Sequence, residues 1–265
     1  MRKREEAGQM KTKKISAKLV IYELRNLMGN PYIAFFGIVF PIFMLFLITH
    51  AMLGDVPASI RPEANTSVFI TMSLIIPMAV VLLGHAANYS QELEKEIPLR
   101  MKLFGFPERS ILCAKAIAQI VALAIGFIIY VVLAYLLIDL EVPALSSALC
   151  ILLCELVLGV LFFMMAHGLA GIFRKFGPTY AITMAFYFGV MILCGMMGIQ
   201  TDQLPKALQY VAGLLPMSYI GSDFIDFWKG GSYNFGPMIQ SYLFLGAVSG
   251  ILLLYANYKN RRVIR

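Results

Sequence analysis

One acidic residue, Glu155, lies inside a long apolar stretch, where a carboxyl group could carry chemistry. Exposing a charged side chain to lipid costs at least about 2.5–3.5 kcal/mol, so such residues usually face protein or water. Glu155 could line a substrate route, bind and release a proton, or stay protonated and hydrogen-bonded between helices. Of these roles we favour the structural one.

Methionines form a second group, concentrated in the apolar stretches after residue 145. Flexible thioethers accommodate varied apolar ligands, which would suit a carrier of amphiphilic compounds. Methionines in membrane helices more often pack against neighbours or face lipid. The candidates for a substrate path are therefore Glu155, Met184, Met191 and Met197.

Patterns for other chemistry are missing from the sequence. No G-x-x-x-x-G-K-[ST] phosphate loop occurs, so the chain cannot cradle ATP in the usual P-loop manner. The three histidines are far apart, and neither H-E-x-x-H nor G-x-S-x-G is present. The four cysteines lie in or beside apolar stretches, where packing explains them better than a disulfide or a metal site. We predict no catalytic residue, no metal site and no cofactor bound by this chain.

The elements that must position these residues are strongly apolar. The 265 residues are 60% hydrophobic and 14% charged, with a mean hydropathy of +0.77, whereas soluble domains are about 45–50% apolar and about 25% charged. A bilayer core needs roughly 20 apolar residues per helix. Six stretches qualify: Tyr32–Leu53, Thr66–Asn88, Ile111–Ile138, Leu145–Phe173, Thr179–Ile199 and Pro237–Tyr255. The sequence predicts an all-α integral membrane protein with six transmembrane helices within residues 31–258.

The Lys and Arg residues predict the orientation, because positive residues in short loops stay in the cytoplasm. All but three of the 22 lie on one side of the six spans, and the exceptions are Arg61, Lys206 and Lys229. Both termini are therefore predicted to be cytoplasmic, in a multi-pass protein of the cell (plasma) membrane. This asymmetry accounts for the net charge of +7, so we expect no nucleic-acid partner.

The two ends of the chain carry basic patterns. Residues 1–11 and 259–265 are predicted to be cytoplasmic tails. Residues 12–30 alternate clusters of apolar and charged side chains, which is typical of a helix lying in the inner membrane interface. This segment is predicted to be an amphipathic elbow helix that leads into the first span.

A long outer loop, residues 200–236, separates the last two spans. Apolar residues repeat in it at helical spacing, and Pro216 interrupts the repeat. We predict two short helices that dip into the outer leaflet, with Trp228 at the headgroup level, where amphipathic rings concentrate.

A charged, amphipathic stretch from Gln91 to Lys115 interrupts two apolar runs. Pro98 is tolerated in the first turn of a helix, so a helix is predicted to begin there, with three acids near its positive N-terminus. Arg100 and Lys102 interrupt its apolar surface and could present charges to a cytoplasmic partner. The alternative is an ordinary positive-inside loop with a surface helix.

This stretch resembles the permeases of ATP-binding-cassette (ABC) exporters of the type-2 family. The resemblance is carried by Glu94-Lys95-Glu96, then Leu99, Leu103, Gly105 and Pro107, then Ala114-Lys115. Asn30-Pro31, Phe40-Pro41, Leu204-Pro205, Leu215-Pro216 and Tyr219 also resemble that family, and the likeness covers most of the chain. Pro98 departs from it, because the family often has glycine after the acidic cluster.

The resemblance implies two sets of site residues. In that family the element between spans two and three is a coupling helix that docks on the nucleotide-binding subunit. Here it implies a coupling segment over residues 91–110, with ATPase contacts at Glu92, Glu94, Lys95, Glu96, Arg100, Lys102, Phe104 and Gly105. It also implies an extracellular re-entrant helical hairpin, marked by Pro205, Pro216, Tyr219 and Trp228.

The function that the resemblance implies is the permease subunit of an ATP-driven exporter, working as two permeases with two ATPase subunits. The ATPase would use ATP and Mg, and the other partners would be a second permease copy and membrane lipids. We expect a hydrophobic or amphiphilic cargo, a drug, antibiotic or lipid-like molecule, leaving a bacterial cell. A polysaccharide or teichoic-acid precursor is the alternative cargo. Other classes left open are a proton-coupled secondary transporter, with Glu155 titrating, and a non-transporting immunity or sensor protein.

Overall fold

The computed structural model describes residues 15–52 and 56–263, and these form helices with no strand among them. The predicted tail of residues 1–11 lies outside the described residues, as does the end of the predicted tail 259–265. In chain order the helices are α1 (Ala17–Met28), α2 (Pro31–Ala34), η1 (Phe35–Val39), α3 (Phe40–Leu47), η2 (Ile48–Met52), α4 (Arg61–Ser73), η3 (Pro77–Leu83), α5 (Gly84–Glu94), α6 (Ile97–Leu103), α7 (Glu108–Leu137), α8 (Leu145–Phe173), α9 (Phe176–Leu193), η4 (Thr201–Gln203), α10 (Lys206–Ala212), α11 (Pro216–Trp228) and α12 (Phe235–Val263).

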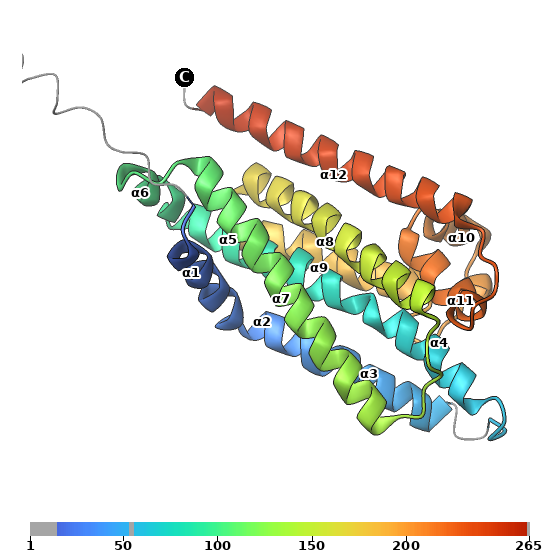
Figure 1. Cartoon of the computed structure of the whole chain (residues 1–265). Coiled ribbons are helices and arrows are strands. Elements are labelled where there is room, and N and C mark those ends of the chain that lie inside the picture. The colour runs from blue at the N-terminus through green and yellow to red at the C-terminus, as the bar shows by residue number, and fades with distance from the viewer. Residues whose placement is uncertain (1–14, 53–55, 264–265) are drawn as a thin grey trace, which may run out of the picture.

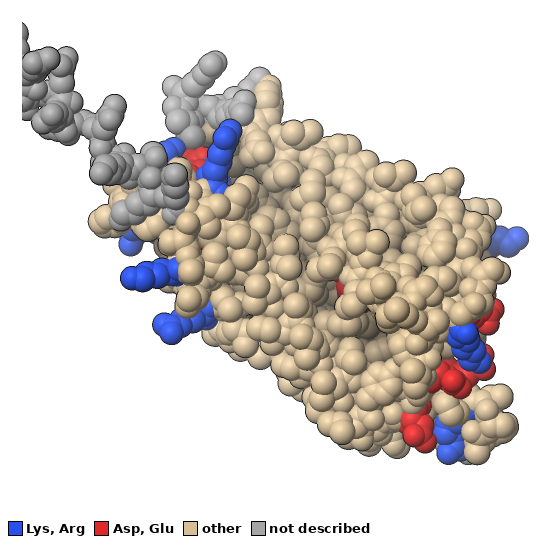
Figure 2. Space-filling model, viewed as in Figure 1, with Lys and Arg blue, Asp and Glu red and all other residues tan. Residues whose placement is uncertain are grey.

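Six helical runs in the described part of the chain are long and apolar enough to cross a membrane. They are Pro31–Ala51, Arg61–Glu94, Glu108–Leu137, Leu145–Phe173, Phe176–Leu193 and Phe235–Asn260. Figure 2 shows the charged side chains gathered toward the two ends of the molecule, with a broad band between them almost free of charge. The predicted all-helical architecture with six apolar spans is confirmed.

The second and fifth spans differ most from their predicted bounds. The second span runs from Arg61 to Glu94, so the predicted coupling segment shares its first residues with the end of that span. The fifth span ends at Leu193 rather than Ile199. Gly195 has a φ of 77°, and the amide of Met196 donates to the carbonyl oxygen of Met191 at 2.9 Å. This is the glycine-containing cap that commonly ends a helix.

The second span forms the centre of the bundle (Figure 1). Its most apolar window is 83% buried, against 39% or less for the other five spans. The middle of the span is the π-helical segment η3, which contacts η1, α7, α8 and α9. A helix that is apolar on every side is normally surrounded by other elements. The η3 sequence PMAVVLL is apolar throughout, and all seven of its residues are buried. Pro77, which lacks a backbone donor, begins this wider segment.

The outer loop contains two short helices, as predicted, because α10 ends at Ala212 and α11 begins at Pro216. The chain breaks there because the residue before a proline is disfavoured in the α region. Pro205 lies just before α10, and the hydroxyl of Tyr219 donates to the carbonyl oxygen of Gly213 at 2.8 Å. That this pair of helices enters the outer leaflet stays a prediction.

That Trp228 lies at the headgroup level stays a prediction, and the structure shows what surrounds its ring. Its side chain is buried, and its indole nitrogen donates to the carbonyl oxygen of Glu141 at 2.9 Å. The ring packs edge-on against Phe69, with 6.0 Å between centroids. A tryptophan beside a tyrosine-rich loop has the composition of an interfacial belt, but an indole can also fill a core when its N–H finds an acceptor.

The two ends of the described chain lie at the same end of the bundle. Figure 1 places α1, α6 and the last residues of α12 there, whereas α10 and α11 lie at the opposite end. The charged stretch after the second span therefore lies beside the helix that precedes the first span.

Candidate functional site

Helix α6 is a short, exposed helix at this end of the bundle. It begins at Ile97, one residue before the predicted start, and Pro98 lies in its first turn. Gly105 has a φ of 86°, and the amide of Phe106 donates to the carbonyl oxygen of Met101 at 3.1 Å. Gly105 therefore has a local task in ending the helix, since the left-handed region strongly favours glycine at this position.

The tip of α6 presents apolar side chains with no partner in the described part of the chain. Leu103 and Phe104 are 68% and 73% exposed, and Leu99 is also exposed. Arg100 and Lys102 are exposed beside them. Apolar side chains gathered on an exposed, charge-rimmed element are typical of a surface that binds another protein or a membrane.

Two of the predicted contact residues also have partners inside the chain. Lys102 forms an exposed ion pair with Glu108 at 2.9 Å, which contributes about 0–1 kcal/mol. The carboxylate of Glu94 accepts the backbone N–H of Phe176 at 3.0 Å. It thereby satisfies a donor at the start of α9, where negative charge is favoured. Lys95 and Glu96 remain exposed.

Glu92 is the one predicted contact residue that the structure moves away from the surface. Its side chain is 6% exposed, and its carboxylate lies 2.7 Å from the ammonium nitrogen of Lys115. Glu92 is on the last turns of α5 and points into the protein, so it cannot touch a docked subunit in this conformation. Its charge serves an internal contact instead.

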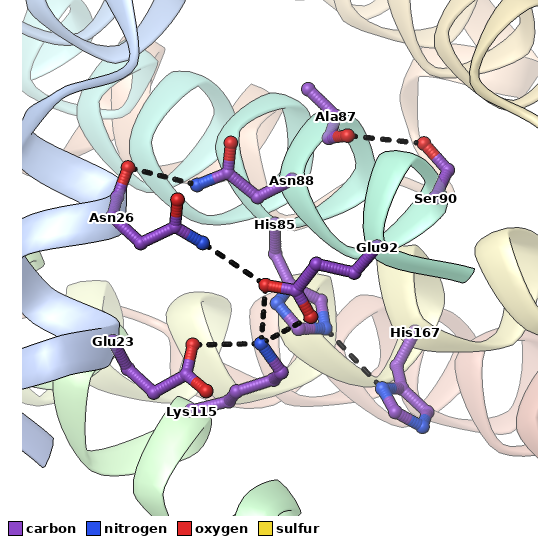
Figure 3. Close-up of polar contacts among 9 residues, drawn as sticks. All are labelled: Glu23, Asn26, His85, Ala87, Asn88, Ser90, Glu92, Lys115 and His167. Atoms are coloured by element: carbon purple, nitrogen blue, oxygen red, sulfur yellow. Dashed lines mark hydrogen bonds and ion pairs between the residues drawn. The ribbon is translucent and has the colours of Figure 1, made fainter. Parts of the chain in front are cut away.

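Lys115 is shared by two buried carboxylates, and we call Glu23, Glu92 and Lys115 the ionic cluster. The ammonium nitrogen also lies 2.7 Å from the carboxylate of Glu23, and all three side chains are at most 6% exposed. They come from α1, α5 and α7 (Figure 3). The cluster therefore joins the helix before the first span to the two helices that flank α6.

Amides extend the ionic cluster along α1. Asn26 donates to the carboxylate of Glu92 at 3.0 Å, and Asn30 donates to the side-chain oxygen of Asn88. Behind them, a ring nitrogen of His85 lies 3.3 Å from one of His167, a contact that needs one nitrogen to donate and the other to accept. Figure 3 shows Asn26, Asn88, His85 and His167 beside the ionic cluster.

Sequence reasoning missed this cluster, although one signal for it was present. Leu19, Glu23 and Leu27 are the buried residues of α1 and follow one another at a spacing of four. An acid at such a position, on the apolar face of a helix, needs a buried cation or donor as partner. The partner itself could not be found, since Lys115 lies 92 residues further along the chain.

The stability of the protein should depend on pH through Glu23. Burial raises the pKa of Glu23 above its ordinary value of 4.5, against the opposing charge of Lys115 and with a further upward contribution from Glu92. The folded protein then holds this proton more tightly than the unfolded chain does. The free energy of unfolding is therefore expected to fall as the pH rises from about 4.5 through the folded-state pKa, and to level off above it.

The check is the unfolding midpoint of the purified protein, measured between pH 4.5 and 8. The difference in midpoint between the wild type and Glu23→Gln should change over this range, whereas the difference between the wild type and Glu96→Gln, at an exposed position, should stay constant. An equally steep dependence in Glu23→Gln would assign the effect to another group.

Glu155 is 2% exposed, so it does not line an open route in this structure. The hydroxyl of Ser73 lies 2.9 Å from one carboxyl oxygen of Glu155 and 2.7 Å from the carbonyl oxygen of Ile70. The Ser73 hydroxyl donates to this carboxyl group, so Glu155 of α8 is held against α4 inside the bundle. This geometry favours the structural role for Glu155.

The methionines of the predicted substrate path are not brought together. Met191 is fully buried in the core, Met184 is partly buried against it, and Met197 is exposed in the turn after α9. Neither the groove lined by Val81 and Ile120 nor the cavity lined by Glu23 and Lys115 includes these methionines or Glu155 in its lining. Their role in a substrate path stays a prediction.

Comparison with known proteins gives the family. The profile of the family described as ABC-2 type transporter matches residues 18–227, which covers most of the chain and extends from α1 into α11. A protein of Bacillus subtilis (strain 168), named "Putative transport permease YvfS", is 23% identical over 248 residues. The alignment covers 92% of this chain and 96% of that protein. The chain therefore belongs to the ABC-2 type transporter family and is a multi-pass membrane permease subunit.

Proposed function

We propose that this permease subunit exports a hydrophobic or amphiphilic molecule, such as a drug, an antibiotic or a lipid-like compound, with energy from ATP. Subunits of this family are normally non-catalytic and work with an ATPase subunit. The observation that carries the proposal is the exposed apolar tip of α6. Short segments join α6 to α5 and α7, the helices that contain Glu92 and Lys115 of the ionic cluster.

In this proposal the ATPase docks on α6. ATP and Mg are used by that subunit, and nucleotide states differ in how they hold the tip formed by Leu103 and Phe104. A ligand shifts a conformational equilibrium only through such a difference in contacts. Two permeases and two ATPase subunits make the working complex, in a bacterial plasma membrane with both permease termini in the cytoplasm.

The ionic cluster would spread that displacement through the permease. Helix α6 is joined to α5 through Lys95 and Glu96 and to α7 through a short turn. Lys115 holds α7 to Glu92 of α5 and to Glu23 of α1. Separating these helices would leave a buried charge without its partner, which is strongly unfavourable. The three helices are therefore expected to move together with α6 and to carry the motion into the first three spans.

Two features support this cargo and energy source over the alternatives. A polymer such as a polysaccharide needs a continuous polar or aromatic corridor, whereas a groove of the bundle lined by Val81, Ile120 and Val160 is almost wholly apolar. A proton-coupled carrier needs a titrating group that reaches water, whereas Glu155 is buried against Ser73.

The test is transport by the purified permease with its ATPase in proteoliposomes, using amphiphilic dyes and a fluorescent phospholipid as probes. We expect ATP-dependent movement of at least one probe, lost when the catalytic glutamate of the ATPase is replaced by glutamine. A protonophore should leave the transport unchanged. Transport that collapses with the proton gradient, or a permease that binds no ATPase, would overturn the proposal.

A further inference from the structure

Glu94 is the last residue of α5, and its side chain reaches the start of the fifth span. Its carboxylate accepts the backbone N–H of Phe176, the first residue of α9, at 3.0 Å. The two residues are 82 positions apart, so this bond joins two helices rather than closing a local turn. Helices α5 and α9 also pack against each other. The end of one helix therefore holds the beginning of another.

The sequence before α9 does not supply a cap for this helix. The first N–H groups of a helix have no partner within it, and Lys175 offers no side-chain acceptor. Pro178 has no N–H, which leaves the amides of Phe176 and Gly177 as the donors of the first turn. A carboxylate is a favoured acceptor there, because the helix N-terminus carries a partial positive charge. Glu94 thus provides from α5 a cap that α9 lacks.

Glu94 is also tied closely to α6, because only Lys95 and Glu96 lie between them. The amides of Lys95 and Glu96 donate to carbonyl oxygens of α5 at 3.0 and 3.2 Å. The carbonyl oxygen of Glu96 accepts the amide of Arg100 in α6 at 3.1 Å. Backbone hydrogen bonds therefore continue from α5 into α6, and a displacement of α6 is expected to carry Glu94 with it.

A row of aromatic rings continues from the start of α9 to the first span. The ring of Phe176 stacks on that of Tyr180, with 5.1 Å between centroids. Tyr180 in turn lies 4.9 Å from the ring of Tyr32 in α2, the first element of the first span. Ring pairs at these separations attract each other beyond the area that they bury. Unbroken contacts thus lead from α6 through Glu94 to the fifth and first spans.

We propose that Glu94 and the rings of Phe176, Tyr180 and Tyr32 form a relay that carries displacement of α6 to the fifth span. Glu94 is a positioning residue in this relay, because it acts through α9. The relay is separate from the ionic cluster, whose three helices lead to the first three spans. The cap on α9 stands independently, whereas the part of the relay in transport rests on the proposed export function.

Hydrogen exchange of the full-length permease in nanodiscs tests the cap. Glu94→Ala should speed amide exchange at Phe176 and Gly177 about 5-fold, the factor expected from loss of a typical helix cap. Glu94→Gln retains an acceptor oxygen and should recover most of the protection. The matched control is Lys95→Ala, at the exposed next position, which should leave exchange in the first turn of α9 unchanged.

Transport by the permease with its ATPase in proteoliposomes tests the relay, with an amphiphilic dye as the probe. Glu94→Ala and Tyr180→Leu should each lower the amount of dye moved per ATP hydrolysed at least about 5-fold, the lower end of usual coupling between sites. The double variant should lose no more than the more severe single variant, because independent effects would multiply and effects in series do not. Glu94→Gln should recover most of the coupling. Tyr255→Leu, which removes an exposed ring on α12, should leave it unchanged.

Unchanged exchange at Phe176 in Glu94→Ala would overturn the cap and the relay together. Normal coupling in both single variants, or losses that multiply in the double variant, would overturn the relay alone. A larger dissociation constant for the ATPase in Glu94→Ala would overturn the positioning role and make Glu94 a docking contact. A wild-type complex that moves no dye with ATP would overturn the export function and the relay, while faster exchange at Phe176 in Glu94→Ala would still support the cap.

Discussion

Lys115→Met is expected to lower the free energy of unfolding of the permease by about 3–5 kcal/mol, because it leaves two buried carboxylates without their cation. Glu23 and Glu92 each lie 2.7 Å from the ammonium nitrogen that this variant removes. Methionine fills a similar volume, so the effect isolates the charge. The measurement is unfolding of the purified protein, followed by size-exclusion chromatography after heating and by denaturant titration.

Two controls make this expectation sharp. Lys102→Met removes the cation of an exposed ion pair with Glu108, and should cost about 0–1 kcal/mol. Combining Lys115→Met with Glu23→Gln and Glu92→Gln should restore most of the stability, since a neutral cluster no longer contains a stranded charge. Wild-type stability in Lys115→Met alone would show that the cluster does not hold the three helices together.

The second large effect is expected at the tip of α6. Phe104→Ala should weaken binding of the ATPase subunit about 30-fold, because truncating an aromatic anchor in an interface costs about 2 kcal/mol or more. Adding Arg100→Glu and Lys102→Glu should further reduce binding and uncouple ATP hydrolysis from transport. The measurements are the dissociation constant of the complex in nanodiscs and the ATPase rate with and without cargo.

The permease itself should remain folded in these variants, since α6 contains no buried residue. Tyr210→Ala is the matched control, because Tyr210 is an equally exposed aromatic residue on α10 at the opposite end of the bundle. It should leave binding and coupling unchanged. If the variant with all three α6 substitutions assembled and hydrolysed ATP like the wild type, α6 would not be the coupling element.

Local features of the chain could be predicted from sequence because each has a local physical cause. The length of an apolar stretch decides whether it can cross the membrane, so all six spans could be predicted. Pro98 favours a first helical turn, and Pro216 ends one helix and begins another. The end of the fifth span was missed because the apolar stretch continues to Ile199, although the positive φ of Gly195 ends the helix before it.

Contacts between distant segments could not be predicted in the same way. Glu92 belongs to a charged stretch whose composition predicts a surface position. It is buried nonetheless, because Lys115 of α7 pairs with its carboxylate. Trp228 is buried because Glu141, far away in the sequence, offers a carbonyl oxygen to its indole. Burial of a polar group depends on a partner, and one sequence does not say which residues become partners.

The ionic cluster also has a consequence for the order in which the protein is made. Glu23 is synthesised before the first span, and Lys115 only after the second. Until the ribosome has produced residue 115, the acid on the buried face of α1 has no cation, and burying it alone is unfavourable. Helix α1 can therefore take its final position only once the third span has begun to form. The helix that is translated first among those described is thus one of those fixed in place only after the third span has begun to form.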